Sequence, residues 1–262
     1  MGCLNTFRRE DVLVVELNRP ESLNALNRDL VDRLRTVFQD LYRDRTVRVV
    51  ILRAAGRVFC AGLDLKEAGA GSDERVSVSD RLDSQRALAE VYVAMRRCPQ
   101  PVICEVQGPA SGGGFALALA SDIRVLAENA RMNAAFIRIG LSACDMGVSY
   151  FLPRMIGQSL ASEYLLTGRF MDARRAFEIG LANRVVPIDQ LAAESDAFAE
   201  DMLRATPLGL RLTKDGLNLS VDAAGLEAVM AIEDRNQMLT AGDPNFTEGM
   251  RAFLEKRPPR YE

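Results

Sequence analysis

Histidine is absent from the sequence. Its absence excludes the Ser-His-Asp and Cys-His systems of nucleophilic catalysis, and it excludes metal sites with imidazole ligands. Any chemistry must therefore use carboxylates, hydroxyls, thiols, Lys, Arg, backbone N–H groups or bound water.

Cysteine pairs and long apolar runs are also missing. The five cysteines form no C-x-x-C pair and their number is odd, so we expect reduced thiols in a cytoplasmic protein, with no metal cluster. No apolar run reaches the roughly 18–20 residues of a membrane-spanning helix, so we predict no membrane span.

An excess of positive charge is lacking as well. The chain has 33 Lys and Arg residues against 36 Asp and Glu residues, a net charge of -3. Nucleic-acid binding depends on the neutralisation of phosphates, so the composition predicts no nucleic-acid partner. A length of 262 residues with 48% hydrophobic residues suits one large domain, or one domain with a helical appendage.

Apolar periodicity predicts alternating strands and helices in the first half of the chain, and helices after that. Asn27 is a plausible helix N-cap. Glycines at 69–71 mark a loop. The predicted strands are 12–17, 47–52, 102–106 and 123–126, and the predicted helices are 27–42, 79–97, 115–120 and most of the chain from about 188.

The run Gly112-Gly113-Gly114 lies between a predicted strand and an apolar, buried helix. Glycines allow the backbone to approach a ligand closely, and the free N–H groups of a first helical turn favour negative charge. The alternative is a tight structural turn. No Lys-Ser/Thr pair follows, so the run is not a P-loop.

A second segment, F-C-A-G-L-D-L at residues 59–65, follows another strand. With the segment 102–114 it resembles the crotonase, or enoyl-CoA hydratase/isomerase, superfamily. The resemblance extends over nearly the whole chain. Further matching segments are 17–20, 24–26, 120–122, 140–141, 152–154, 156–157, 167–168, 180–186 and 248–257.

The resemblance implies an α/β fold, a crotonase (ClpP-like) spiral of β-β-α units with a C-terminal helical trimerisation region. The spiral core with the acyl-CoA site would comprise residues 1–195. Residues 196–262 would form the helical region that completes the coenzyme A (CoA) site and the oligomer interface. The implied partners are an acyl-CoA thioester and further copies of the chain, as a homotrimer or dimer of trimers. CoA is then part of the substrate, and no separate cofactor is expected.

In this family two backbone N–H groups form an oxyanion hole, and the resemblance places them at Leu63 and Gly113. Fixed donors stabilise the negative charge that develops on a thioester oxygen when the enolate forms. One such donor is typically worth about 3 kcal/mol.

The resemblance also implies contacts with the substrate. The family usually carries Lys or Arg directly after the proline at position 20, but this chain has Glu21, so Arg19 is the alternative phosphate contact. Residues of the last helix would serve a neighbouring subunit, and Asp122 resembles a structural carboxylate. The predicted substrate-binding residues are Arg19, Ser22, Ala61, Asp64, Leu65, Lys66, Gly112, Phe136, Phe253 and Lys256.

The sequence departs from the hydratases of this family at both of their catalytic glutamates. The positions that match them are Ala116 and Phe136, whose side chains cannot transfer protons. The sequence therefore argues against two-glutamate hydration of a 2-enoyl-CoA.

One acid remains near the expected place. Asp145 precedes a helix that begins near Val148, and the dienoyl-CoA isomerase and aroyl-CoA dehalogenase branches carry an acid at or near this position. We consider Asp145 the candidate acid/base or nucleophile. The alternative is a helix N-cap.

Glu105 stands in the middle of a predicted strand and points to the face opposite Cys104. If it is buried, it needs a partner, so we consider a structural ion pair and a repurposed catalytic base. Arg138 could pair with Asp145, with Glu105 or with a charged acyl group. Cys144 is expected to be a packed thiol.

Isomerisation of a double bond requires one group that moves a proton between carbons, so a single carboxylate favours it over hydration. Thioester hydrolysis and hydration at a rearranged water site are alternatives. A non-catalytic acyl-CoA-binding protein is a hypothesis of another class. RNA binding, known in a branch with a lysine-rich helix, is disfavoured because the predicted helix 79–97 contains no lysine.

Overall fold

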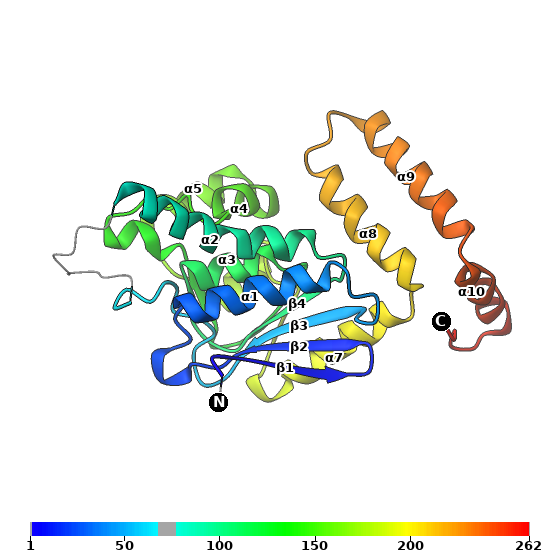
Figure 1. Cartoon of the computed structure of the whole chain (residues 1–262), viewed down its shortest axis with the longest axis horizontal. Coiled ribbons are helices and arrows are strands. Elements are labelled where there is room, and N and C mark those ends of the chain that lie inside the picture. The colour runs from blue at the N-terminus through cyan, green and yellow to red at the C-terminus, as the bar shows by residue number, and fades with distance from the viewer. Residues whose placement is uncertain (1, 68–76, 262) are drawn as a thin grey trace.

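The computed structural model describes residues 2–67 and 77–261 (Figure 1). The predicted loop at 69–71 lies outside the described residues. The larger of two sheets has the strand order β1-β2-β3-β4-β6-β9 and the smaller has the order β5-β7-β8. The strands are β1 Leu4–Arg9, β2 Val12–Leu17, β3 Val49–Ala54, β4 Val102–Val106, β5 Ala110–Ser111, β6 Ile123–Ala127, β7 Arg131–Asn133, β8 Met171–Asp172 and β9 Arg184–Val186.

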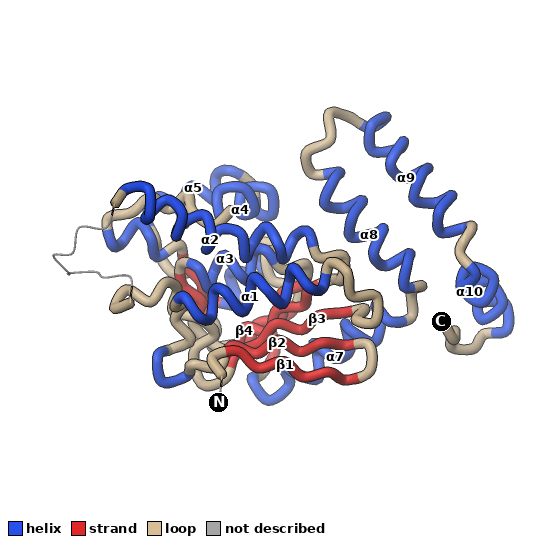
Figure 2. Tube along the Cα trace, viewed as in Figure 1, coloured by secondary structure: helices blue, strands red, loops and turns tan. Residues whose placement is uncertain are grey.

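Helices cover both faces of the larger sheet (Figure 2). The α-helices are α1 Arg28–Leu41, α2 Val78–Arg97, α3 Gly113–Ala120, α4 Val148–Ile156, α5 Gln158–Thr167, α6 Ala173–Glu178, α7 Leu191–Leu203, α8 Pro207–Ser220, α9 Leu226–Ala241 and α10 Pro244–Glu255. Short 3-10 helices lie at η1 Pro20–Ser22, η2 Ala135–Ile139 and η3 Ile188–Gln190.

The chain winds as a spiral that alternates between the two sheets. It runs from β4 into β5 and then α3, and its next turn runs from β6 into β7 and then η2. Within the larger sheet every pairing after β1–β2 is parallel. These two turns each add one strand to each sheet and end in a helix, α3 or the 3-10 helix η2, which confirms the predicted β-β-α units.

Burial explains why the inner strands are apolar along their whole length. All five residues of β4 are buried, because helices α1 to α3 pack on one face of the sheet and α7 packs on the other. The prediction for α1 is confirmed in detail, since the Asn27 side chain accepts the Leu30 N–H (3.1 Å). The third strand begins at Val49, two residues later than predicted, and the exposed strand β1 was not predicted.

A cluster of charges joins α8 to the core. The Lys214 ammonium is 4% exposed and lies 2.9 Å from an Asp122 carboxylate oxygen, while Arg96 of α2 donates to the other oxygen (2.7 Å). Burial alone would raise the pKa of Asp122, but Lys214 and Arg96 outweigh it and lower the pKa. The structural role predicted for Asp122 is confirmed.

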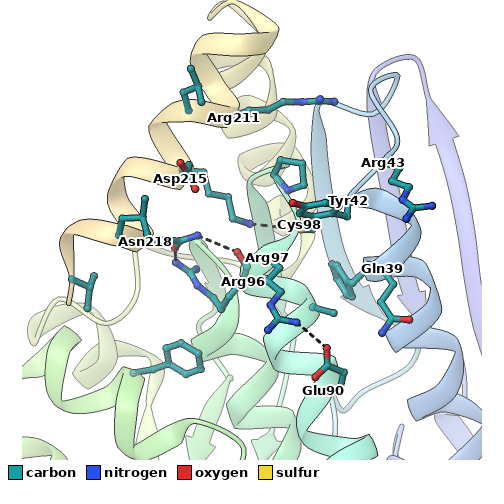
Figure 3. Close-up of a pocket in the computed structure, with 18 of the residues that line it drawn as sticks. Gln39, Tyr42, Arg43, Glu90, Arg96, Arg97, Cys98, Arg211, Asp215 and Asn218 are labelled. Carbon is teal, nitrogen blue, oxygen red and sulfur yellow. Dashed lines mark hydrogen bonds and ion pairs between the residues drawn. The ribbon is translucent and has the colours of Figure 1, made fainter. Parts of the chain in front are cut away.

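A cleft of about 1550 Å³ separates α8 from the ends of α1 and α2 (Figure 3). At its edge the Asn218 amide donates to the Arg96 carbonyl (3.0 Å). Among the described residues, the lining includes none of Leu63, Gly113 and Asp145. This cleft is therefore separate from the predicted acyl-CoA site.

Helices α9 and α10 extend away from the core as an arm (Figure 1). None of their described residues except Ala252 is buried. No helix in the described ranges combines the length and the apolar character that crossing a membrane requires. The division of the chain near residue 195 stays a prediction.

We predict that Asp122→Ala lowers the free energy of unfolding by about 3–5 kcal/mol, because it leaves the buried Lys214 and its neighbour Arg96 without a counter-charge. Urea titration followed by circular dichroism measures this. The control is Asp215→Ala, which removes an exposed carboxylate paired with Arg235 at 3.4 Å and should change stability by less than about 1 kcal/mol. Equal stabilities of the two variants would contradict the prediction.

Candidate active site

The two glycine-containing loops lie side by side beyond the ends of β3 and β4. The Ser111 N–H donates to the Cys60 carbonyl (2.9 Å), and Cys60 forms a parallel bridge with Ala110. A Cβ atom on Gly62 would lie 2.9 Å from the Ser111 carbonyl oxygen and 3.5 Å from the Gly113 nitrogen. Gly62 also has a φ of +95°, which other residues rarely adopt. Position 62 therefore requires glycine, and the start of α3 lies against it.

The backbone N–H groups of Leu63 and Gly113 are unpaired. Leu26 donates to the Gly62 carbonyl (2.7 Å) and accepts from the Asp64 N–H (3.1 Å). In such a parallel bridge the N–H of the middle residue, Leu63, points to the opposite side. Gly113 begins α3, so its N–H has no acceptor within the helix. In the part of the chain that the structure describes, neither amide has an acceptor.

Close packing surrounds the first turn of α3. A Cβ atom on Gly113 would lie 2.6 Å from Leu26 Cδ1 and 3.2 Å from Met146 Sδ. The buried Tyr92 hydroxyl donates to the Gly113 carbonyl (3.1 Å) and lies 3.1 Å from the same sulfur. Packing requires a glycine at position 114, where a Cβ atom would lie 2.4 Å from the Cys60 carbonyl oxygen, so the structural interpretation and the ligand-site interpretation of the run are compatible.

Asp145 immediately precedes Met146, whose side chain packs against this turn. Its Oδ1 accepts the Gln85 amide N–H (2.6 Å) and the Met146 N–H (2.7 Å). Helix α4 begins at Val148 with Gly147 as its N-cap and no side-chain cap bond, so the helix-cap interpretation of Asp145 is wrong. Asp145 thus precedes a residue whose side chain packs against Gly113. We call the region around Leu63, Gly113 and Asp145 the corner.

The backbone is strained beside Asp145. Met146 has a φ of +51°, a left-handed conformation that costs a non-glycine residue about 1–2 kcal/mol. Such strain persists only where the surrounding structure enforces it, and it is common at functional sites. Here it points the Met146 sulfur at Gly113 while the preceding carboxylate faces α2.

The two positions at which the sequence analysis expected the family's glutamates are apolar and buried. Phe136 is 5% exposed, and its ring would lie 3.4 Å from a Cβ atom on Gly112. Ala116 is fully buried and donates its N–H to the Gly112 carbonyl (3.0 Å). Neither position offers a proton-transferring group.

Arg19 and Asp64 form an ion pair of 3.0 Å, and both side chains are less than one-fifth exposed. Burial alone would raise the pKa of Asp64, but the hydrogen bonds from Arg19 outweigh it and lower the pKa. Arg19 also donates to the Ala25 carbonyl. The pair ties the loop after β2 to the loop that carries Leu63. This favours a structural role for Arg19 over the predicted phosphate contact.

The other predicted binding residues divide into two groups. Ala61, Leu65 and Lys66 are exposed on the loop around Leu63, and Ser22 lies partly buried in η1. Phe253, 84% exposed, lies on α10 and Lys256 is the C-cap residue of this helix, which is far from this loop in the same chain (Figure 1). The structure therefore separates the predicted site residues of the core from those of the arm.

Comparison with known proteins identifies the family. The family model described as "Enoyl-CoA hydratase/isomerase" matches residues 8–262. The chain belongs to the enoyl-CoA hydratase/isomerase family. Members of this family are enzymes that act on acyl-CoA, and this chain is one of them.

Three relatives illustrate the range of this family. The chain is 42% identical over 259 residues to "Probable enoyl-CoA hydratase EchA12" of Mycobacterium tuberculosis, covering 97% of this chain and 90% of that protein. It is 34% identical over 255 residues to "1,2-epoxyphenylacetyl-CoA isomerase" of Escherichia coli, covering 95% and 94%. The crystal structure of an enoyl-CoA hydratase from Bacillus anthracis superposes with a TM-score of 0.93 at 30% identity, covering 99% of each chain. These matches confirm the predicted crotonase fold.

Glu105 lies away from the corner, and among the described residues it lacks the expected ion pair. It is 6% exposed on the sheet face covered by α7, opposite the face that carries α3. Within the described ranges no cation lies within 4 Å of it. The arginines whose charges act on Glu105 pair with other acids, Arg53 with Glu16 (2.8 Å) and Arg9 with Asp196 (2.7 Å). Burial raises the pKa of Glu105 to about 7, although the charge of Arg53 opposes the shift. The interpretation of Glu105 as a catalytic base loses its support.

Two further expectations change. Cys144 is exposed, so the expectation of a packed thiol is wrong. Among the described residues, Arg138 forms no ion pair with Asp145 or Glu105. Sequence reasoning also missed Tyr92 and Gln85, which occupy one face of α2 seven residues apart. A polar residue in helical register with a buried tyrosine was the available signal.

We predict that Glu105→Gln stabilises the protein at alkaline pH. The folded-state pKa of about 7 exceeds the usual 4.5, so the native state binds the extra proton and the free energy of unfolding falls as pH rises from 4.5 to 7. Above pH 7 the buried charge costs about 3 kcal/mol, which glutamine avoids. Denaturant titrations should show the variant more stable at pH 8 and equal to wild type at pH 4.

A matched control is Glu90→Gln, which alters a surface carboxylate paired with Arg97 at 3.4 Å and should leave the pH dependence unchanged. A Glu105→Gln variant that is less stable than wild type at pH 8 would show that nearby arginines stabilise the buried carboxylate after all.

Proposed function

We propose that the enzyme isomerises the double bond of an enoyl-CoA thioester. The N–H groups of Leu63 and Gly113 would bind the thioester oxygen, and Asp145 would be the single acid/base. The observation that carries this proposal is the contact between the first turn of α3 and the loop of Asp145, where Met146 Sδ lies 3.2 Å from the Cβ position of Gly113. Asp145 immediately precedes Met146, so its carboxylate is held close to the loop that carries the Gly113 amide.

The chemistry follows from this arrangement. With the thioester oxygen between the two amides, the Asp145 carboxylate removes a proton from one carbon of the acyl group, and the electron pair delocalises onto the oxygen. The protonated Asp145 then returns the proton to another carbon of the conjugated system, which moves the double bond. Each amide contributes about 3 kcal/mol to the stabilisation of the enolate, because its hydrogen bond to the oxygen strengthens as negative charge develops there.

Hydration requires more than this site offers. Adding water to a double bond needs groups that hold and deprotonate the water as well as a group that protonates the α-carbon. The resemblance assigns those roles to the positions of Ala116 and Phe136, both of which are buried and apolar. We infer that the acids have been lost here. The isomerase from E. coli among the relatives is consistent with that inference, although hydratases are among them too.

The rim of the corner suits the CoA moiety. Lys66 is exposed and has no counter-charge among the described residues, so it is available to a phosphate or to the adenine. Ser22, Ala61 and Leu65 surround the same loop, and Asp64 is held there by Arg19. We propose this loop as the seat of the pantetheine and nucleotide portions of the substrate.

We also propose that the arm completes the CoA site of a neighbouring copy in a trimer or dimer of trimers. Large apolar side chains on α9 and α10 are exposed, among them Leu226 (73%), Met238 (70%), Phe253 (84%) and Leu254 (80%). Apolar surface of this extent favours burial against another protein surface. Phe253 and Lys256 would then reach the loop of Lys66 in the next subunit.

We predict that Asp145→Asn lowers kcat for isomerisation of a 3-enoyl-CoA by about 10²–10⁴-fold, because asparagine cannot accept a proton. The assay follows conversion of 3-enoyl-CoA to 2-enoyl-CoA, with hydration and CoA release measured in parallel. Binding of a saturated acyl-CoA by calorimetry serves as the folding control and should change little.

The other functions predict other results. Equal rates for wild type and Asp145→Asn would sink the proposal, and no turnover of any thioester by either protein would leave an acyl-CoA-binding protein. Release of CoA as the main reaction would indicate a thioester hydrolase. Faster hydration than isomerisation by wild type would also contradict the assignment.

For the assembly, we predict that light scattering of the full chain gives the mass of a trimer or hexamer, and that Phe253→Asp combined with Leu254→Asp reduces it. The two new charges would be desolvated in an interface. The control is Arg174→Ala, which alters an 89% exposed side chain of α6 outside the arm and the Lys66 loop and should leave the mass unchanged. A monomeric wild-type chain would refute the proposed assembly.

A further inference from the structure

The Asp145 carboxylate is held asymmetrically. Both of its donors, the Gln85 side-chain amide at 2.6 Å and the Met146 N–H at 2.7 Å, bind the same oxygen, Oδ1. Oδ2 has no hydrogen-bond partner and no ion-pair partner among the described residues. Two fixed donors on one oxygen determine the rotation of the carboxylate about its Cβ–Cγ bond, so one particular oxygen stays free.

Helix α2 supplies this restraint at two points. Gln85 and Tyr92 are seven residues apart, two helical turns, and therefore lie on one face of α2. Tyr92 contacts Met146 Sδ and the Gly113 carbonyl at the buried end, while Gln85 binds Asp145 at the exposed end. One helix face thus holds both the strained loop and the glycine turn, and it sets the carboxylate relative to the start of α3.

The chemical type of the partner suits a residue that must gain and lose a proton. A carboxamide donates a hydrogen bond but does not titrate, so it cannot compete with Asp145 for the proton. A cation at position 85 would favour the ionised carboxylate strongly and hinder its action as an acid. The nearest charged side chains on the helix, Asp83 and Arg86, are each 71% exposed and lie 3.8 Å from each other.

We propose that Gln85 is a positioning residue for catalysis, which fixes Oδ1 of Asp145 and so makes Oδ2 the oxygen that carries the proton between carbons of the acyl group. This inference rests on the proposed function of Asp145. It adds the residue that orients the base and identifies the oxygen that reacts.

The test replaces Gln85 with methionine, which preserves side-chain length and removes the donor. Loss of one hydrogen bond to a charged group corresponds to a fall in kcat of about 10- to 100-fold, with KM within about threefold of wild type. Wash-in of solvent deuterium at the acyl carbons, measured by mass spectrometry, should fall by the same factor. The melting temperature should not change, because Gln85 is exposed. The matched control on the same helix is Arg86→Met, which should leave both rates unchanged.

A double-mutant cycle separates orientation from a structural effect. If Gln85 acts through the carboxylate, Gln85→Met should change the residual rate of Asp145→Asn by less than about twofold. A kcat of Gln85→Met within twofold of wild type would overturn the inference, and so would a fall of equal factor in both backgrounds. Full activity of Asp145→Asn would instead overturn the proposed function itself, so the two failures are distinguishable.

Discussion

The close approach of two main-chain segments at Gly62 and Gly113 is the constraint on which the site depends. No side chain can stand at Gly62, because its Cβ atom would lie 2.9 Å from a carbonyl oxygen, and a Cβ atom on Gly113 would lie 2.6 Å from Leu26 Cδ1, which would have to move. The parallel bridges that join these loops to Leu26 and Ala110 are continuations of sheet pairing beyond the strand ends. The spiral therefore brings the two amides to one corner through ordinary backbone hydrogen bonds, and the surrounding side chains pack against a frame that is already set.

Charge is distributed in keeping with this frame. Buried ionic groups serve the scaffold: Lys214, Asp122 and Arg96 join α8 to the core, and Arg19 with Asp64 joins two loops of the site. The corner itself contains neutral donors, namely backbone amides, the Tyr92 hydroxyl and the Gln85 amide, around a single carboxylate. A neutral donor orients a carboxylate without holding it in the ionised form as strongly as a paired cation would.

The sequence predicted those parts of the fold whose signals are local. The helix that begins after Asn27, the apolar strand β4 and the glycine turn before α3 all carry their periodicity or their cap within a few residues. Strand β1 was missed because four of its six residues are exposed and three of these four are polar, and the strands of the smaller sheet are only two or three residues long.

The motifs predicted which loops form the candidate site. They could not predict side-chain contacts between segments that are distant in the sequence: Arg19 contacts Asp64, 45 residues away, and Gln85 contacts Asp145, 60 residues away. The position of Glu105 on the α7 face was correctly inferred to be opposite Cys104, yet which helix would cover that face depends on the topology.

We propose that main-chain N–H groups bind the thioester oxygen, and this has a consequence for how such an enzyme evolves. The N–H of Leu63 survives replacement of its side chain, which is 36% exposed and separate from the hydrogen-bonding function of the backbone. Replacement of the Leu63 side chain would therefore leave intact the N–H group that we propose binds the carbonyl oxygen. A change of reaction then requires only that one or two acid residues move to other positions. Binding of the thioester oxygen by the main chain would stay the same.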